Sequence, residues 1–133
     1  MKFLKIVESK KPSYIEVFLK DENDTPISKC KISFTSEIWQ ITEWYTNKEY
    51  QHKGYGTDTL KFALKRLFAD KGEPREIHYV WNGENAFVFE WLKKHFSPTC
   101  LLAMEVRKYL NGDDWRAHIY VLDKGSVMRY MVS

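Results

Sequence analysis

The feature that most constrains the fold of this sequence is a change in the spacing of its apolar residues at 51–57, from a strand pattern to a helical one. Before this point, three runs rich in β-branched and aromatic residues predict strands over 14–19, 27–34 and 37–45. After it, apolar residues recur at helical spacing, at Leu60, Leu64, Leu67 and Phe68. Thr57 or Asp58 is expected to cap this helix, and Gly72 and Pro74 end it. A strand that leads directly into a helix predicts a mixed α/β fold.

The remaining runs complete this α/β pattern. We expect strands at Lys2–Val7, 76–81, 101–109 and 115–122, a helix from Glu84 to about His95, and a last strand after Gly125. The strands over 14–45 should be antiparallel, with a tight turn at Thr35 and Ser36. Strands 37–45 and 76–81 flank a helix, so they should be parallel neighbours joined by a right-handed crossover.

Size and composition indicate one globular domain over residues 1–133. Cys30 and Cys100 lie far apart in the chain without a CxxC pair, so we expect buried thiols rather than a disulfide or a zinc site. No apolar run approaches the roughly 18 residues that a membrane span needs. The apolar stretch at the N-terminus is too short for a secretory signal. These features predict a cytoplasmic protein that does not bind membranes.

The positive charge of the chain is concentrated in one segment. The whole formal net charge of +3 arises in residues 47–75, and the two flanking segments are balanced. A nucleic-acid-binding protein usually has a broader basic surface, so no nucleic-acid partner is expected. A local excess of positive charge is enough for a small polyanion.

The segment Gln51-His52-Lys53-Gly54-Tyr55-Gly56 carries the functional signal. Two glycines directly before a helix allow a ligand to approach the backbone, and the start of a helix has unpaired amides that bind phosphate oxygens. The alternative is that Gly54 and Gly56 only form a tight turn. The segment is not a dinucleotide fingerprint, because Thr59 replaces the third glycine, and no GxxxxGK[ST] loop occurs.

Residues Trp44–Leu60 resemble motif A of the GNAT superfamily of N-acetyltransferases. The similarity includes Glu49-Tyr50 before Gln51, the pair Lys53-Gly54, and an apolar residue four places after Gly56. The order of expected elements agrees with the family over about residues 13–122. The resemblance implies a GNAT-like fold, with splayed parallel strands, and acetyl-CoA as co-substrate.

The resemblance also implies roles for single residues. The loop amides should bind the pyrophosphate of acetyl-CoA, from Gln51, His52, Lys53, Gly54, Tyr55, Gly56 and Thr57. Backbone groups of Trp44, Tyr45 and Thr46 should bind the pantetheine and polarise the thioester carbonyl. Asn82 or Asn85 should lie beside the pantetheine, and Phe89 is a candidate to pack against it.

Two departures from the family pattern are present. The family's second helix usually carries a tyrosine that protonates the leaving thiolate, but either Trp91 or Phe89 takes its place here, depending on the alignment. The family also inserts two helices between its first two strands, and only Glu8–Ser13 is available for them. The chain is therefore expected to be a short form whose acceptor site is open or completed by a second subunit.

The catalytic residues are expected near the strand that precedes the loop. An amine must lose its proton to attack a thioester, and Glu43 is the first candidate for the base, followed by Glu37 and Glu16. Tyr45, Tyr79 or Tyr109 could supply the missing acid. His78 is expected to be a core histidine, and the histidine spacings predict no metal site.

Two functions from different classes fit these observations. The first is an N-acetyltransferase that transfers acetyl directly to the amine of a small molecule or a protein. The second is a non-catalytic module of GNAT fold that binds acyl-CoA or a partner, which the missing tyrosine and the missing helix pair favour. The apolar residues of 125–132 could pack on their own domain as an extra strand, or they could pair across a two-fold axis, which predicts a homodimer.

Overall fold

The computed structural model describes residues 5–11, 13–35, 37–81, 86–97, 99–107 and 114–133. The chain divides into two compact units, Met1–Arg75 and Glu76–Ser133. We describe each unit by itself. That the whole chain is one domain stays a prediction from the sequence.

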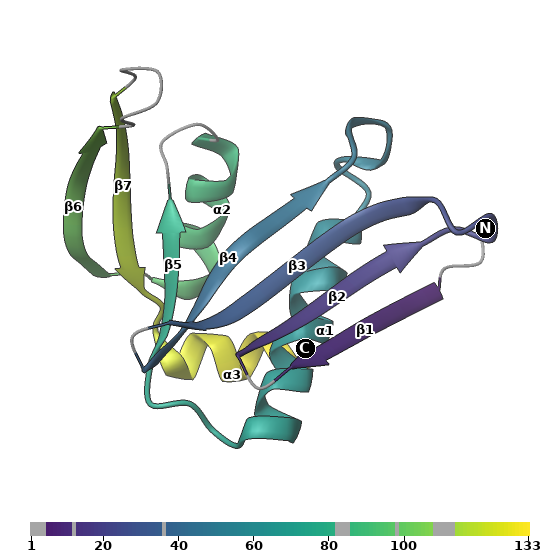
Figure 1. Cartoon of the computed structure of the whole chain (residues 1–133), viewed down its shortest axis with the longest axis horizontal. Helices are drawn as coiled ribbons and strands as arrows, with labels where there is room; N and C mark the ends of the chain where they lie inside the picture. The colour runs from purple at the N-terminus through teal and green to yellow at the C-terminus, as the bar shows by residue number, and fades with distance from the viewer. Residues whose placement is uncertain (1–4, 12, 36, 82–85, 98, 108–113) are drawn as a thin grey trace. The chain divides into compact units, whose positions relative to one another are not determined.

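The first unit is an antiparallel four-stranded meander with one long helix. Its strands are β1 (Lys5–Lys11), β2 (Tyr14–Lys20), β3 (Pro26–Thr35) and β4 (Ile38–Thr46), each paired with the next along the chain. The helix α1 (Tyr55–Lys71) lies against one face of these strands, behind them in Figure 1. Alternate residues of β2 and β3 are buried on that face, together with Leu60, Leu64 and Leu67 of α1. The alternating apolar residues of the strands and the helically spaced apolar residues of α1 therefore pack together in one core.

A β-bulge in β4 decides which of its side chains share a face. Lys31 is the partner of Glu43 and Ile32 is the partner of Ile41, so Thr42 is the extra residue. Ile41 and Trp44 therefore both lie on the α1 side of the sheet, although they are three positions apart. Glu43 and Tyr45 point to the other face, which we call the open face because no helix among the described residues of this unit covers it.

The second unit contains three strands and two helices. Its strands are β5 (Ile77–Trp81), β6 (Thr99–Arg107) and β7 (Asp114–Val121), and β7 pairs antiparallel with both of the others. Its helices are α2 (Ala86–Phe96) and α3 (Lys124–Val132). The two helices meet through aromatic rings, because Tyr130 of α3 packs edge-on against Trp91 and Phe96 of α2. These ring contacts add to the burial of apolar area.

The beginning of the chain differs in detail from the sequence prediction. We expected a first strand over Lys2–Val7, whereas β1 extends to Lys11 and pairs along its length with β2. The first half is therefore a sheet of four antiparallel strands rather than three. Because β2 begins at Tyr14, the described residues leave no room for a helix pair between these two strands. This agrees with the expected short form of the fold.

The predicted last strand after Gly125 is wrong. This segment is the helix α3, because Asp123 caps its first turn and the buried Val127, Tyr130 and Met131 follow helical spacing. A strand pairing between two copies of this segment is excluded with it. The short run contains both β-branched and helix-favouring residues, so packing within the second unit decided its conformation.

Asp123→Ala should destabilise the second unit. The Asp123 carboxylate accepts hydrogen bonds from the amide of Ser126 at 3.0 Å and from its hydroxyl at 2.7 Å. These bonds, with a smaller contribution from Arg129, lower the pKa of Asp123 below its ordinary 3.8. A depressed pKa stabilises the fold above the unfolded-state value, and this stabilisation is lost as the pH falls through the folded-state value. Thermal unfolding should show a lower Tm for the variant at pH 7, and a gap to the wild type that shrinks only below pH 3.8. An equal Tm for both proteins at pH 7 would contradict the role of this cap.

Candidate functional site

The start of α1 has the geometry of an anion-binding loop. β4 ends at Thr46, a short 3₁₀ turn follows (η1, Lys48–Tyr50), and α1 begins at Tyr55. Gly54 is the N-cap, in the left-handed conformation with φ 87° and ψ 0°, and no side chain caps the helix. The prediction that Thr57 or Asp58 would cap it is wrong, because both lie inside the first turn. The first helical bond runs from the Asp58 amide to the Gly54 carbonyl, at 3.0 Å.

The start of α1 follows an exposed loop and stands at the positive end of the helix dipole. The amides of Tyr55, Gly56 and Thr57 precede the first intrahelical hydrogen bond and stand at the positive end of the helix dipole. The preceding loop residues, Gln51 to Gly54, are all exposed. A methyl group built on Gly54 would meet no protein atom within 4 Å. That these residues bind a phosphate group stays a prediction from the sequence.

Side chains of β4 hold the start of α1 close to the strand. The indole nitrogen of Trp44 donates a hydrogen bond to the carbonyl of Gly56, at 2.9 Å. A methyl group on Gly56 would lie 2.8 Å from the Thr46 hydroxyl, so only glycine allows this approach. The Thr46 hydroxyl is itself 3.0 Å from the hydroxyl of Ser28, and its carbonyl accepts a bond from the Gln51 side chain. Two hydrogen bonds and the close approach of Gly56 to Thr46 thus hold the loop and the helix start against the strand.

The backbone groups of the three predicted pantetheine-binding residues point in two directions. The Asn47 amide donates a hydrogen bond to the carbonyl of Ile27 on β3. Because the backbone groups of successive residues in a strand point alternately to its two sides, this bond fixes the direction of each residue before it. The backbone of Tyr45 therefore points toward β3, and its carbonyl also accepts a bond from the Ser28 hydroxyl at 2.9 Å. The backbone groups of Trp44 and Thr46 point toward the opposite edge of β4.

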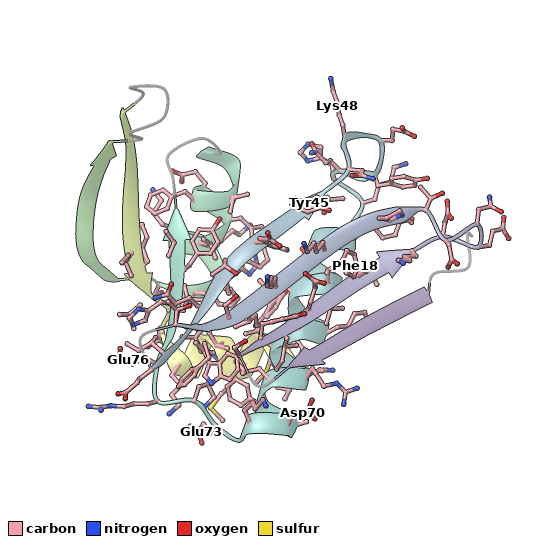
Figure 2. All side chains as sticks on the ribbon, viewed as in Figure 1. Phe18, Tyr45, Lys48, Asp70, Glu73 and Glu76 are labelled. Atoms are coloured by element: carbon pink, nitrogen blue, oxygen red, sulfur yellow. The ribbon has the colours of Figure 1, made fainter. Side chains whose placement is uncertain are left out.

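The two predicted catalytic residues lie together on the open face. Figure 2 shows Tyr45 on β4 and Phe18 on β2, and Tyr45 is 48% exposed. Glu43 forms an ion pair with Lys29 of β3, at 2.5 Å between Oε2 and Nζ. Glu16 of β2 contacts the same ammonium group at 3.2 Å. The hydrogen bond to Glu43 is the largest cause that raises the pKa of Lys29 above its usual value, so this lysine is charged at neutral pH.

The predicted residues of the second unit have different outcomes. Asn82, Asn85 and Tyr109 lie outside the described residues. Phe89 is half-buried on α2, and its ring packs 5.0 Å from that of Tyr120 on β7. His78 is buried, with Nε2 2.9 Å from a carboxylate oxygen of Glu76, as expected of a core histidine.

The structure also places three polar side-chain groups at the candidate site that the sequence analysis did not single out. These are the hydroxyl of Ser28, the ammonium group of Lys29 and the side-chain amide of Gln51, which reaches back to β4. Their partners lie 5 to 18 positions away in the chain, beyond any local pattern. Cys30 is fully buried, which confirms that prediction, and burial raises the pKa of its thiol. The side chain of Cys100 lies outside the described part.

Neither a metal-binding cluster nor a membrane-spanning helix occurs among the described residues. They contain no group of three or more His, Cys, Asp or Glu side chains that could hold a metal ion. Among the same residues, no helix combines the length and the apolar character that crossing a membrane requires.

Comparison with known families identifies the chain. The model of the acetyltransferase (GNAT) family matches residues 4–87, which is more than half of the sequence. The chain belongs to the GNAT family of acetyltransferases. This match contains all of β4, the loop and α1. No curated protein sequence matches the chain significantly.

Solved structures of GNAT proteins share the fold at low sequence identity. Spermidine N-acetyltransferase from Vibrio cholerae, in complex with CoA and spermine, has a TM-score of 0.66 and 12% identity over 88% of this chain and 69% of its own. The ribosomal-protein-S18-alanine N-acetyltransferase from Escherichia coli has a TM-score of 0.64 and 15% identity, over 85% and 70%. A protein from Bacillus anthracis str. Ames, provisionally named streptothricin acetyltransferase and bound to acetyl coenzyme A, has a TM-score of 0.63 and 15% identity, over 90% and 84%. These similarities confirm the predicted GNAT-like α/β fold.

Proposed function

We propose that this GNAT protein is an acetyl-CoA-dependent N-acetyltransferase that transfers acetyl directly to a primary amine. The observation that carries the proposal is the start of α1, where no side chain caps the helix and the space beside Gly54 holds no protein atom within 4 Å of a built methyl group. The family is one of acetyltransferases, and structural neighbours are complexes with CoA or acetyl coenzyme A. Acetyl-CoA is therefore the anionic ligand that best suits the loop.

In this proposal, the loop binds the phosphates and β4 binds the thioester arm. The loop amides from His52 to Gly56 receive the pyrophosphate, and the side chains of His52 and Lys53 add donors beside it. The Gln51 amide, also predicted for this role, instead donates to the carbonyl of Lys48, at 3.4 Å. The edge of β4 that carries the backbone groups of Trp44 and Thr46 binds the pantetheine. An amide of this edge polarises the thioester carbonyl and stabilises the oxyanion. Asn82, Asn85 and Phe89 remain candidates to contact the pantetheine.

The transfer step needs one base and one acid. The nitrogen of a neutral amine attacks the thioester carbon, a C–N bond forms, and the C–S bond breaks to release CoA. Glu43 accepts the proton that the nitrogen loses, and Tyr45 supplies a proton to the leaving thiolate. Both side chains lie on the same face of β4, and Tyr45 is exposed enough to reach a ligand. The acceptor is the amine of a small molecule or of a protein, the two kinds named for the neighbours.

One observation favours a non-catalytic acyl-CoA-binding module instead. Phe89 and Trp91 lie on the helix on which the family usually carries a tyrosine as general acid, and both pack against neighbouring rings. Neither side chain can protonate a thiolate. The module would bind acetyl-CoA with the same loop but would release no thiol. The homodimer and the cytoplasmic location stay predictions from the sequence.

A panel of amines tests the proposal. Purified protein is mixed with acetyl-CoA and small amines, polyamines or peptide N-termini, and release of free thiol is measured. We expect at least one amine to give turnover that Glu43→Gln lowers about 10²- to 10⁴-fold, the usual contribution of a general base. Calorimetry with acetyl-CoA on the same variant is the control, since Glu43 lies off the loop. Binding of acetyl-CoA without thiol release from any amine would favour the non-catalytic module, and no binding would refute both.

A further inference from the structure

We propose that Lys29 is a positioning residue for the acetyl transfer, which holds Glu43 beside Tyr45 and places a positive charge next to the attacking amine. This inference rests on the proposed function. The ion-pair cluster that carries it consists of Glu16 on β2, Lys29 on β3 and Glu43 on β4, and all three lie on the open face of the first unit.

The contacts of this cluster do not follow from strand pairing. Glu16 and Glu43 are both Cα partners of Lys31, not of Lys29. Yet both carboxylates reach diagonally to the ammonium group of Lys29, whereas Lys31 stands over the ring of Tyr14, at 4.6 Å from its centroid. The Cα partner of Lys29 on β4 is Tyr45. The diagonal contacts therefore draw Glu43 toward the segment that is proposed to hold the thioester.

The exposure of the side chains in the cluster indicates which carboxylate a ligand can reach. The side chains of Lys29 and Glu16 are only 17% and 18% exposed, whereas that of Glu43 is 46% exposed. Lys29 also lies 5.4 Å from the ring centroid of Phe18, so its ammonium group is enclosed by two carboxylates and an aromatic face. The ion pair uses Oε2 of Glu43 and leaves Oε1 to accept a proton. A carboxylate held at one oxygen keeps its direction, which a base needs.

The charge of Lys29 has a second effect on an incoming amine. The cluster holds two carboxylates and one ammonium group, so its net charge is about −1. Lys29 offsets one of the two negative charges, so the cluster stabilises the protonated acceptor less than the two carboxylates alone would, and only the neutral form attacks. The other titratable residues at positions of this face are Lys5 and Lys11 on β1, Tyr14 and Lys20 on β2, Lys31 on β3 and Tyr45 on β4. Of these, Lys31 is the Cα partner of Glu16 and Glu43, and Tyr45 is that of Lys29.

Lys29→Met, with Lys31→Met as its matched control, tests the proposal. The two lysines lie on the same strand and the same face, and each stands over an aromatic ring, Phe18 for Lys29 and Tyr14 for Lys31. Of the two, only Lys29 forms ion pairs with carboxylates. With the best amine of the panel, Lys29→Met should lower kcat about ten- to a hundredfold while the KM for acetyl-CoA stays unchanged. Lys29→Arg should restore most of the rate, because it keeps the charge and the donors. Lys31→Met should remain within about twofold of the wild type.

The pH profile separates positioning from a loss of stability. Removal of Lys29 leaves two carboxylates beside the bound amine, which stabilises its protonated form, so the rising limb of the kcat profile, which requires the neutral amine, should move to higher pH. In the Glu43→Gln background, Lys29→Met should cost little further rate, because the two residues act as a unit. If the wild type is active and Lys29→Met keeps its kcat and pH profile, the role of Lys29 is overturned while the proposed function stands. A wild type that releases no thiol with any amine would instead overturn the proposed function, and this inference with it.

Discussion

Gly54→Ala should weaken acetyl-CoA binding by about tenfold or more, which corresponds to about 1.4 kcal/mol. The new methyl group would meet no protein atom within 4 Å, so it would project into the space above the loop amides. A phosphate that approaches those amides would be displaced by it. Calorimetric titration with acetyl-CoA measures the effect.

Gly72→Ala is the matched control for this variant. Gly72 ends α1 with φ 77°, and a methyl group there also meets nothing within 4 Å. Both substitutions therefore impose backbone strain without a collision: about 1–2 kcal/mol in the left-handed region at Gly54, and about 1–3 kcal/mol at Gly72, whose ψ of −176° lies in a region that glycine alone populates readily. Only Gly54 lies at the proposed phosphate site, so Gly72→Ala should lower the Tm and leave the affinity unchanged. Equal affinities for the two variants would reduce the loop at Gly54 to a simple turn.

Gly56→Ala should destabilise the first unit and lower acetyl-CoA affinity together. Its methyl group would lie 2.8 Å from the hydroxyl oxygen of Thr46, closer than a real contact allows. Either α1 or β4 must move, and overpacking of this kind costs about 1–3 kcal/mol. The same movement would stretch the bond from the Trp44 indole to the Gly56 carbonyl. Chemical denaturation and calorimetry measure the two effects.

Thr46→Ala provides the test of cause for this collision. It removes the hydroxyl that the new methyl group would strike, at the expense of the hydrogen bond to Ser28. Gly56→Ala should therefore cost less in the Thr46→Ala background, with a coupling of roughly 1 kcal/mol. Additive losses of stability would show that Gly56 is needed for another reason.

The sequence determined the parts of this protein that depend on local periodicity. The apolar spacing of Leu60, Leu64 and Leu67 predicted α1, and alternation predicted β3, because one face of each element must be buried. The motif around Gly54 and Gly56 predicted the family, which the family model confirms. The loop before the helix was predicted for the same reason, since glycine at a positive φ is a local requirement.

Tertiary packing decided the features whose partners are distant in the chain. The segment after Gly125 became a helix because Tyr130 packs on Trp91 and Phe96, a contact that no local pattern contains. The bulge at Thr42 placed Glu43 on the open face, and only the pairing of β3 with β4 reveals it. Likewise, Lys29 meets Glu16 and Glu43 diagonally across three strands, against their register. A single sequence records the period of each element, but the contacts between elements depend on register and on the direction in which long side chains lean, and these are set only when the strands assemble.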